Sequence, residues 1–267
     1  MNRTAQQTAF IDALRSTGAN LALVARAGCG KTTTILEAVD EYVAANPAAE
    51  ITVCCFNNGV KKEIADKLVK RGHGDWKKVQ ASTTHAMGFG LTKFAFCPRG
   101  KAQDDFVDDK KVFKLIDGKN DPVYAEYATQ IAKLVALAKG EGFGFFGDVQ
   151  IGDAGAWYAM AAHYDVNDFE DTSDMDRVID FSDMILFPLV KNLRVKFQRD
   201  LIFVDEAQDT SRARRALIKK FVKHGGRIVV VGDDRQAIMG FAGASADALT
   251  EFRDDLQAVV LPLNVTW

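Results

Sequence analysis

The stretch LALVARAGCGKT, residues 21–32, joins an apolar strand to a glycine-rich turn and the start of a helix. Residues 21–25 are short, continuous and apolar, as is typical of a parallel strand covered on both faces. Gly28 and Gly30 allow the backbone to turn, so that its N–H groups and the helix N-terminus surround a polyphosphate. This order of strand, loop and helix predicts a phosphate-binding loop.

The end of this loop carries the residues that a nucleotide and its metal need. Lys31 is expected to reach the terminal phosphates of ATP, and the Thr32 hydroxyl is expected to bind Mg²⁺. Ala25 stands where the general pattern has its first glycine, so the match is a variant. The alternative is a glycine-rich turn with a chance Gly-Lys-Thr, which the preceding buried strand disfavours. The expected nucleotide contacts of the loop are Ala27, Gly28, Cys29, Gly30, Lys31, Thr32 and Thr33.

A second motif, LIFVDEAQD at residues 201–209, places two carboxylates at the end of another apolar strand. Ligands of open α/β sheets bind at the carboxyl ends of the strands. Asp205 is therefore expected to hold Mg²⁺ opposite Thr32, and Glu206 to orient and deprotonate the attacking water. The alternative is a solvated strand end with ordinary carboxylates, which is less favoured beside a phosphate-binding loop.

The rest of the chain predicts a doubly wound α/β domain. Residues 51–56, 79–82 and 227–231 are further predicted strands, and residues 32–44 and 57–72 are predicted helices between them. Buried strands that alternate with amphipathic helices indicate a parallel sheet. From residue 92 to residue 196 there is no convincing buried strand, and 124–140 and 175–190 are helical in pattern. We expect residues 1–91 and 197–267 to form one lobe, into which 92–196 insert a mainly helical subdomain.

Composition limits the classes of protein. The 267 residues are 48% apolar and 26% charged, with a net charge of −2, so any nucleic-acid contact must come from a local basic surface. The N-terminus is not a signal peptide, and no window approaches the roughly 20 apolar residues of a membrane span. The four cysteines have no CxxC spacing, which argues against zinc and favours a reducing cytoplasm.

Taken together, the motifs resemble the UvrD/Rep-like group of superfamily 1 helicases. The resemblance rests on ARAGCGKT (25–32) with VDEAQD (204–209), and on five further segments in the family's order. These are TAQQ (4–7), CFNNGVKKEI (55–64), STTHAMGFG (82–90), IDFSDMIL (179–186) and VVVGDDRQAIMGFAGA (229–244). The resemblance implies a RecA-like P-loop NTPase lobe that binds ATP, Mg²⁺ and single-stranded DNA, from a helicase or translocase that moves 3′ to 5′.

The resemblance also implies roles for individual residues. Gln7 would read the adenine edge, and Gln236 would sense the γ-phosphate and couple it to DNA. The residues implied to lie on the DNA are Phe56, Asn58, Thr83, His85 and Phe241. Three positions depart from the family pattern. Met239 and Ala242 replace a tyrosine and an arginine, which removes an aromatic ring and a guanidinium from the implied DNA contacts. Thr33 stands where the family often has an arginine, so the stacking on adenine that this arginine would give is absent.

The family's transition-state arginines would follow Trp267, together with a second RecA-like lobe. We therefore expect the 267-residue chain to be monomeric, to bind ATP and to hydrolyse it poorly. Two alternatives are a nucleotide-switched DNA-binding module without efficient catalysis and a small-molecule kinase. The kinase would leave the DEAQD and GDDRQAI segments without a role.

Two other features have plainer explanations. The basic residues of 212–223 could contact a DNA backbone, but a solvated helix face is the favoured interpretation. The letters GFGFFG at 142–147 match a dinucleotide fingerprint but follow a helix rather than a strand, so we discard that match.

Overall fold

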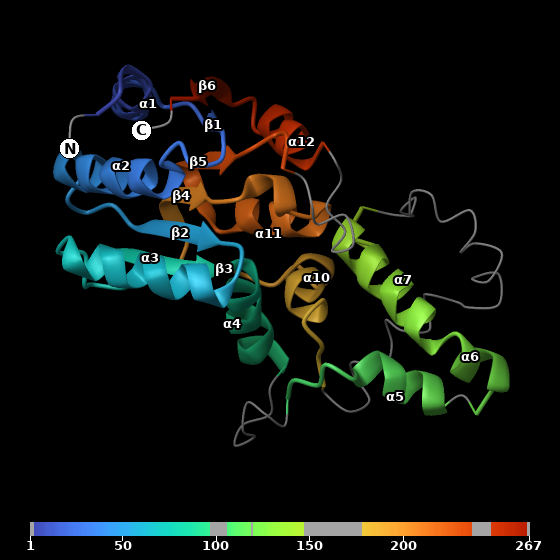
Figure 1. Cartoon of the computed structure of the whole chain (residues 1–267). Helices are drawn as coiled ribbons and strands as arrows, with labels where there is room; N and C mark the ends of the chain where they lie inside the picture. The colour runs from blue at the N-terminus through green and yellow to red at the C-terminus, as the bar shows by residue number, and fades with distance from the viewer. Residues whose placement is uncertain (1–2, 97–105, 119, 147–177, 237–246, 266–267) are drawn as a thin grey trace.

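The computed structural model describes residues 3–96, 106–118, 120–146, 178–236 and 247–265. In this part of the chain one sheet of six parallel strands has the order β3-β2-β4-β5-β1-β6 (Figure 1). The strands are β1 (Leu21–Ala25), β2 (Ile51–Cys55), β3 (Val79–Thr83), β4 (Arg199–Val204), β5 (Val222–Gly232) and β6 (Val259–Leu263). The predicted α/β class with a parallel, RecA-like sheet is confirmed.

Helices cover both faces of the sheet, because the strands are apolar on both sides. Along β4, Leu201 and Phe203 enter one core cluster, while Ile202 and Val204 enter the other. The first cluster contains side chains of α1 (Ala5–Ser16), α2 (Lys31–Ala45) and α3 (Asn58–Lys70). The second contains side chains of α4 (Thr84–Phe96), α11 (Arg212–Lys220) and α12 (Ala248–Asp255). The result is a three-layer α/β/α lobe whose loops meet at the strand ends.

The segment between β3 and β4 is mainly helical in its described parts, which also contain a β-bridge between Val107 and Ile179. It contains α5 (Lys111–Gly118), α6 (Pro122–Glu126), α7 (Ala128–Glu141) and α10 (Asp183–Val190). The helices α5, α6 and α7 lie to one side of the sheet (Figure 1). They form a small apolar core that contains Ile116 of α5 and Ile131 of α7. Helix α10 instead packs on the lobe, where Ile185 joins Leu217 of α11. We keep the division into 1–91, 92–196 and 197–267 as a proposal, which places one boundary inside α4.

A buried ionic cluster holds this insertion together. The ammonium of Lys139 lies 2.6 Å from Asp183 and 2.9 Å from Asp180, and Lys111 lies 2.8 Å from Asp183. The Asp183 side chain is fully buried. Its Oδ2 atom, which binds Lys111, also accepts the backbone N–H of Asp180. Burial alone would raise the pKa of Asp183, but the ammonium groups of Lys139 and Lys111 hold it below its usual range.

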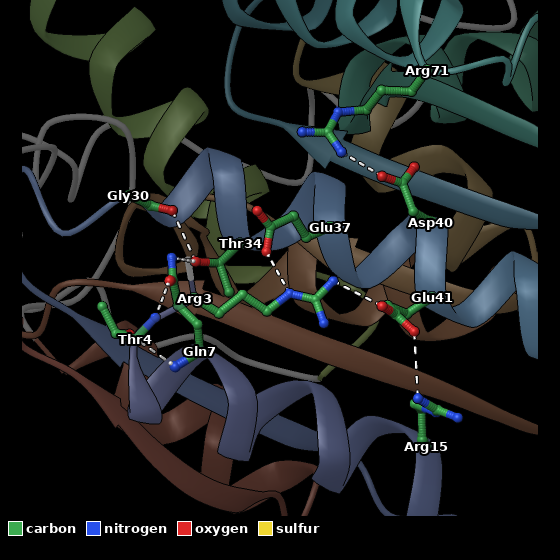
Figure 2. A network of polar contacts seen from close by, with 10 residues as sticks. All are labelled: Arg3, Thr4, Gln7, Arg15, Gly30, Thr34, Glu37, Asp40, Glu41 and Arg71. Carbon is green, nitrogen blue, oxygen red and sulfur yellow. Dashed lines mark hydrogen bonds and ion pairs between the residues drawn. The ribbon is translucent and has the colours of Figure 1, made fainter. Parts of the chain in front are cut away.

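The N-terminal helix is tied to α2 by surface ion pairs (Figure 2). Arg3 binds Glu37 at 2.9 Å and Glu41 at 2.8 Å, and Arg15 binds Glu41 from the last turn of α1. These contacts fix the start of the chain beside the helix that follows the phosphate-binding loop.

Four features differ from the sequence-based expectations. Strand β6 does not follow from the sequence pattern, and β4 and β5 begin earlier than residues 201 and 227. The helix predicted over 175–190 begins only at Asp183, since the described residues 178–182 are not helical. The interpretation of the basic segment as a solvated helix face is wrong for Arg215, which is buried and bonds to Glu251 at 2.5 Å. None of the described helices is long and apolar enough to cross a membrane.

Candidate functional site

The loop after β1 has the backbone of an anion-binding turn. Gly28 and Gly30 have φ angles of +75° and +78°, a left-handed conformation that favours glycine. Gly30 is the N-cap of α2, and among the described residues no side chain caps the helix, so its first N–H groups have no side-chain acceptor from that part of the chain. This geometry suits a polyphosphate group at the helix N-terminus.

The lysine of the loop and the acidic strand tip converge on one place. Lys31 Nζ lies 3.1 Å from Glu206 Oε2, although the two residues are 175 positions apart in the chain. Lys31 begins α2 beyond β1, Glu206 follows β4, and β5 lies between these strands in the sheet. The carboxyl ends of β1 and β4 thus bring the two predicted halves of the site together.

A chain of polar contacts connects this ion pair to the rest of the loop. Gln208 donates its amide N–H to Glu206 at 2.7 Å and accepts the backbone N–H of Asp233 at 3.1 Å. The Asp233 carboxylate accepts the backbone N–H of Ala27 and a guanidinium N–H of Arg26, at 3.1 Å and 3.0 Å. The loop ends of β1, β4 and β5 therefore form one hydrogen-bonded unit.

Gly232 makes this connection possible. A Cβ at that position would lie 2.4 Å from Gln208 Oε1, so any side chain would displace the amide. Gln208, Arg26 and Asp233 were not assigned a role from the sequence. Gln208 and Asp233 lie inside the recognised motifs, but nothing in their spacing indicates that they contact each other across two strands.

Asp205 and Thr32 are suited to a magnesium ion. Asp205 is 5% exposed at the end of β4, and burial, reinforced by Glu206, raises its pKa to about 6. A nearby cation would offset that cost. Among the described residues the Thr32 hydroxyl makes no hydrogen bond, and no three His, Cys, Asp or Glu side chains are grouped to hold a metal. Mg²⁺ commonly takes one or two protein ligands and completes its shell with phosphates and water, so these residues fit it.

Gln7 lies close to the loop, but its amide is already engaged (Figure 2). Its oxygen accepts the backbone N–H of Thr4, and its N–H donates to the Thr34 hydroxyl at 3.0 Å. Thr34 in turn donates to the carbonyl of Gly30 at 2.9 Å. Gln7 therefore supports the first turn of α2, and its amide still has a second N–H and a second oxygen lone pair.

The residues implied for DNA lie at the carboxyl ends of β2 and β3. Phe56 follows β2 and is half-buried, and Asn58 begins α3 in an exposed position. The Thr83 hydroxyl is buried and accepts the backbone N–H of Ala86. His85 follows on α4, and burial, reinforced by Arg214, lowers its pKa to about 4, so its ring is neutral at pH 7. These residues gather beside the nucleotide site, on the far side of β4.

Gln236 and Phe241 are the remaining predicted site residues. Gln236 is half-buried just after β5, and its backbone N–H bonds to Asp233 at 3.2 Å, which places it beside the loop. Phe241 lies outside the described residues, as do Met239 and Ala242. Its predicted contact with DNA stays a prediction.

The chain is similar to known proteins over most of its length. Residues 4–257 match the family described as UvrD/REP helicase N-terminal domain. The ATP-dependent DNA helicase Rep of Escherichia coli is 26% identical over 255 residues, which cover 89% of this chain and 37% of that protein. The ATP-dependent DNA helicase PcrA of Bacillus subtilis is 26% identical over 261 residues, which cover 91% of this chain and 35% of that protein.

A further relative, DNA helicase II of Haemophilus influenzae, is 32% identical over 105 residues. The 267 residues thus span little more than a third of the length of Rep and PcrA. The family match covers the whole sheet except its last strand. On this evidence the chain belongs to the UvrD/REP helicase N-terminal domain family.

Proposed function

We propose that the chain is the N-terminal motor lobe of an ATP-dependent DNA helicase or translocase. The observation that carries the proposal is the 3.1 Å contact between Lys31 and Glu206, with Asp205 immediately before it. These side chains come from the two motifs that a P-loop NTPase uses for the phosphates, the metal and the attacking water. The names of the relatives, all ATP-dependent DNA helicases or DNA helicase II, support DNA as the second ligand.

Each residue of the site has a chemical task in this proposal. Lys31 exchanges Glu206 for the terminal phosphates and balances their charge, while the backbone of Ala27 to Thr33 holds them. Thr32 and Asp205 hold Mg²⁺, which supplies further charge neutralisation when bound. Glu206, released from Lys31, positions a water in line with the γ-phosphate and accepts its proton.

The DNA would lie beside the nucleotide rather than on it. We propose that single-stranded DNA contacts Phe56, Asn58, Thr83, His85 and Phe241, and that movement is 3′ to 5′. Gln236 would report the state of the γ-phosphate, because its backbone is bonded to Asp233, which also holds the loop at Ala27. Gln7 would read the adenine through the second N–H and the second oxygen lone pair of its amide.

Full activity would need a second RecA-like lobe that brings arginines to the developing charge on the phosphate. The test compares the 267-residue chain with a form that carries such a lobe, each with and without single-stranded DNA. We expect slow phosphate release from the chain alone and DNA-stimulated release from the longer form. The readout is steady-state ATP hydrolysis.

The same assay separates the alternatives. Nucleotide-dependent DNA binding without DNA-stimulated hydrolysis in the longer form would favour the switched binding module and contradict a motor. Transfer of the γ-phosphoryl group to a small molecule, without any effect of DNA, would favour a kinase.

A further inference from the structure

A cavity of about 270 Å³ lies where the insertion meets the lobe. Its walls come from α4, α7, α10 and α11, and it is separate from the phosphate-binding loop. The lining residues are His85, Ala136, Lys139, Gly140, Ser182, Ile185 and Arg214. The cavity is therefore lined on one side by His85, one of the residues implied for DNA, and on the other by the helical insertion.

Arg214 lines this cavity beside an aromatic ring. It is half-buried in the first turn of α11, and its guanidinium carbon lies 5.9 Å from the centre of the Phe56 ring. Among the described residues its side chain has no hydrogen bond or ion pair. The neighbouring arginines differ, since Arg215 bonds to Glu251 and Arg212 lies 3.9 Å over the ring of Phe146.

Arg214 is also the one unpaired charge among the described residues that line the cavity. Lys139 is paired with Asp180 and Asp183, and the ring of His85 is neutral at pH 7. A half-buried guanidinium has lost water without gaining an acceptor, which is unfavourable unless an anion approaches it. Burial lowers the pKa of Arg214, yet a guanidinium stays charged at neutral pH. The charge of Arg214 therefore favours the binding of an anion in this cavity.

One aromatic ring lies beside this cation, and another lies beside its cavity neighbour His85. Phe56 approaches Arg214 from the loop after β2. Phe181 precedes α10, is 55% exposed and meets the edge of His85 at 6.1 Å between ring centres. Exposed or half-buried rings beside an arginine are the combination that binds bases and backbone of single-stranded nucleic acid.

We propose that Arg214 binds a phosphate of the single-stranded DNA that passes Phe56 and His85. The inference rests on the proposed function and deepens it, because it names a phosphate contact from α11. Arg suits this task, since its planar group gives two N–H bonds to one phosphate. Asp209 offers a competing explanation, because its buried Oδ1 has no hydrogen-bond partner among the described residues and its carboxylate interacts electrostatically with Arg214.

The test measures binding of a fluorescent oligo(dT) to the 267-residue chain by anisotropy at several salt concentrations. Arg214→Ala is expected to weaken binding about 10- to 100-fold, the loss of one charge-assisted contact. It should also lower the slope of log affinity against log salt by about 0.7, the value for one phosphate of a single strand. Arg214→Lys should keep most of that slope. Arg212→Ala, on the same helix but over Phe146, is the matched control and should change neither quantity.

Two further measurements distinguish the possible outcomes. Thermal unfolding shows whether each variant is folded, and competition with inorganic phosphate at equal phosphate concentration separates a free anion from a strand. Equal affinity and slope for Arg214→Ala and the unaltered chain would overturn the inference while leaving the proposed function intact. Lost affinity with an unchanged slope would also overturn it and favour a structural pair with Asp209. If inorganic phosphate displaces oligo(dT) as well as a DNA strand does, the ligand is a free anion, which would overturn the inference of a strand contact. No oligo(dT) binding by the unaltered chain would overturn the inference and the proposed DNA-binding function together.

Discussion

Glu206→Gln is expected to lower the rate of DNA-stimulated ATP hydrolysis about 10²- to 10⁴-fold, the range for loss of a general base. The substitution keeps the size and shape of the side chain. The neutral amide of glutamine, however, cannot accept the proton of the attacking water. Affinity for ATP should not fall, because Lys31 loses its competing carboxylate and remains free to bind phosphate. The measurements are phosphate release by the two-lobed form and titration with a non-hydrolysable ATP analogue.

The control is Glu63→Gln, which alters a 61% exposed carboxylate on α3 that pairs only with its helix neighbour Lys67 in the described structure. It should leave both measurements unchanged. A Glu206→Gln variant that hydrolyses ATP as fast as the unaltered protein would remove Glu206 from the chemistry. Loss of nucleotide binding instead of hydrolysis would assign it to the phosphate pocket.

Lys139→Met is expected to lower the free energy of unfolding by about 3–5 kcal/mol. The change leaves Asp180 without its ammonium partner and leaves the fully buried Asp183 with Lys111 alone. Methionine preserves most of the side-chain volume, so the loss reflects charge rather than a cavity. Chemical denaturation followed by circular dichroism measures the effect.

The matched control is Lys114→Met, whose partner Asp108 also lies in the insertion but whose side chain is 70% exposed. An exposed pair contributes about 0–1 kcal/mol, so little change is expected. Because Asp183 has a pKa below its ordinary value, its contribution is present above that value and lost as pH falls through the folded-state pKa. Equal destabilisation by the two substitutions would contradict the role given to the buried cluster.

The strands that the sequence predicts are those buried on both faces, since their continuous apolar runs are a local signal. Strand β6 lacks that signal, because Val259 and Val260 are 47% exposed and Pro262 interrupts it. Proline has no N–H to donate, so it is tolerated at the edge of a sheet, where β6 lies beside β1. Its assignment depends on pairing with a segment more than 230 positions away, which no local pattern contains.

The site is predictable to the extent that its motifs are contiguous. Lys31 and Glu206 could be assigned separately, and the fold then brought them together. The bonds from Gln208 to Glu206 and Asp233 depend instead on the order of β4, β5 and β1 and on the missing side chain at Gly232. The engaged amide of Gln7 is another contact that only the packing of α1 on α2 reveals.

The basic helix illustrates a limit of charge patterns. A cluster of cations usually lies on a solvated face, yet α11 is amphipathic and packs Ala213 and Leu217 inward. Arg214 and Arg215 border this inward face, so one reaches the cavity beside His85 and the other binds Glu251. Which arginine is exposed depends on the helices that surround α11.

In the proposed function Lys31 and the Asp205–Glu206 strand end bind one magnesium–triphosphate complex. An experimental structure of the chain with Mg²⁺ and a non-hydrolysable ATP analogue would test this proposal. We expect Lys31 to leave Glu206 for the terminal phosphate, with Thr32 and Asp205 at the metal. An intact Lys31–Glu206 ion pair with the triphosphate bound elsewhere would contradict it.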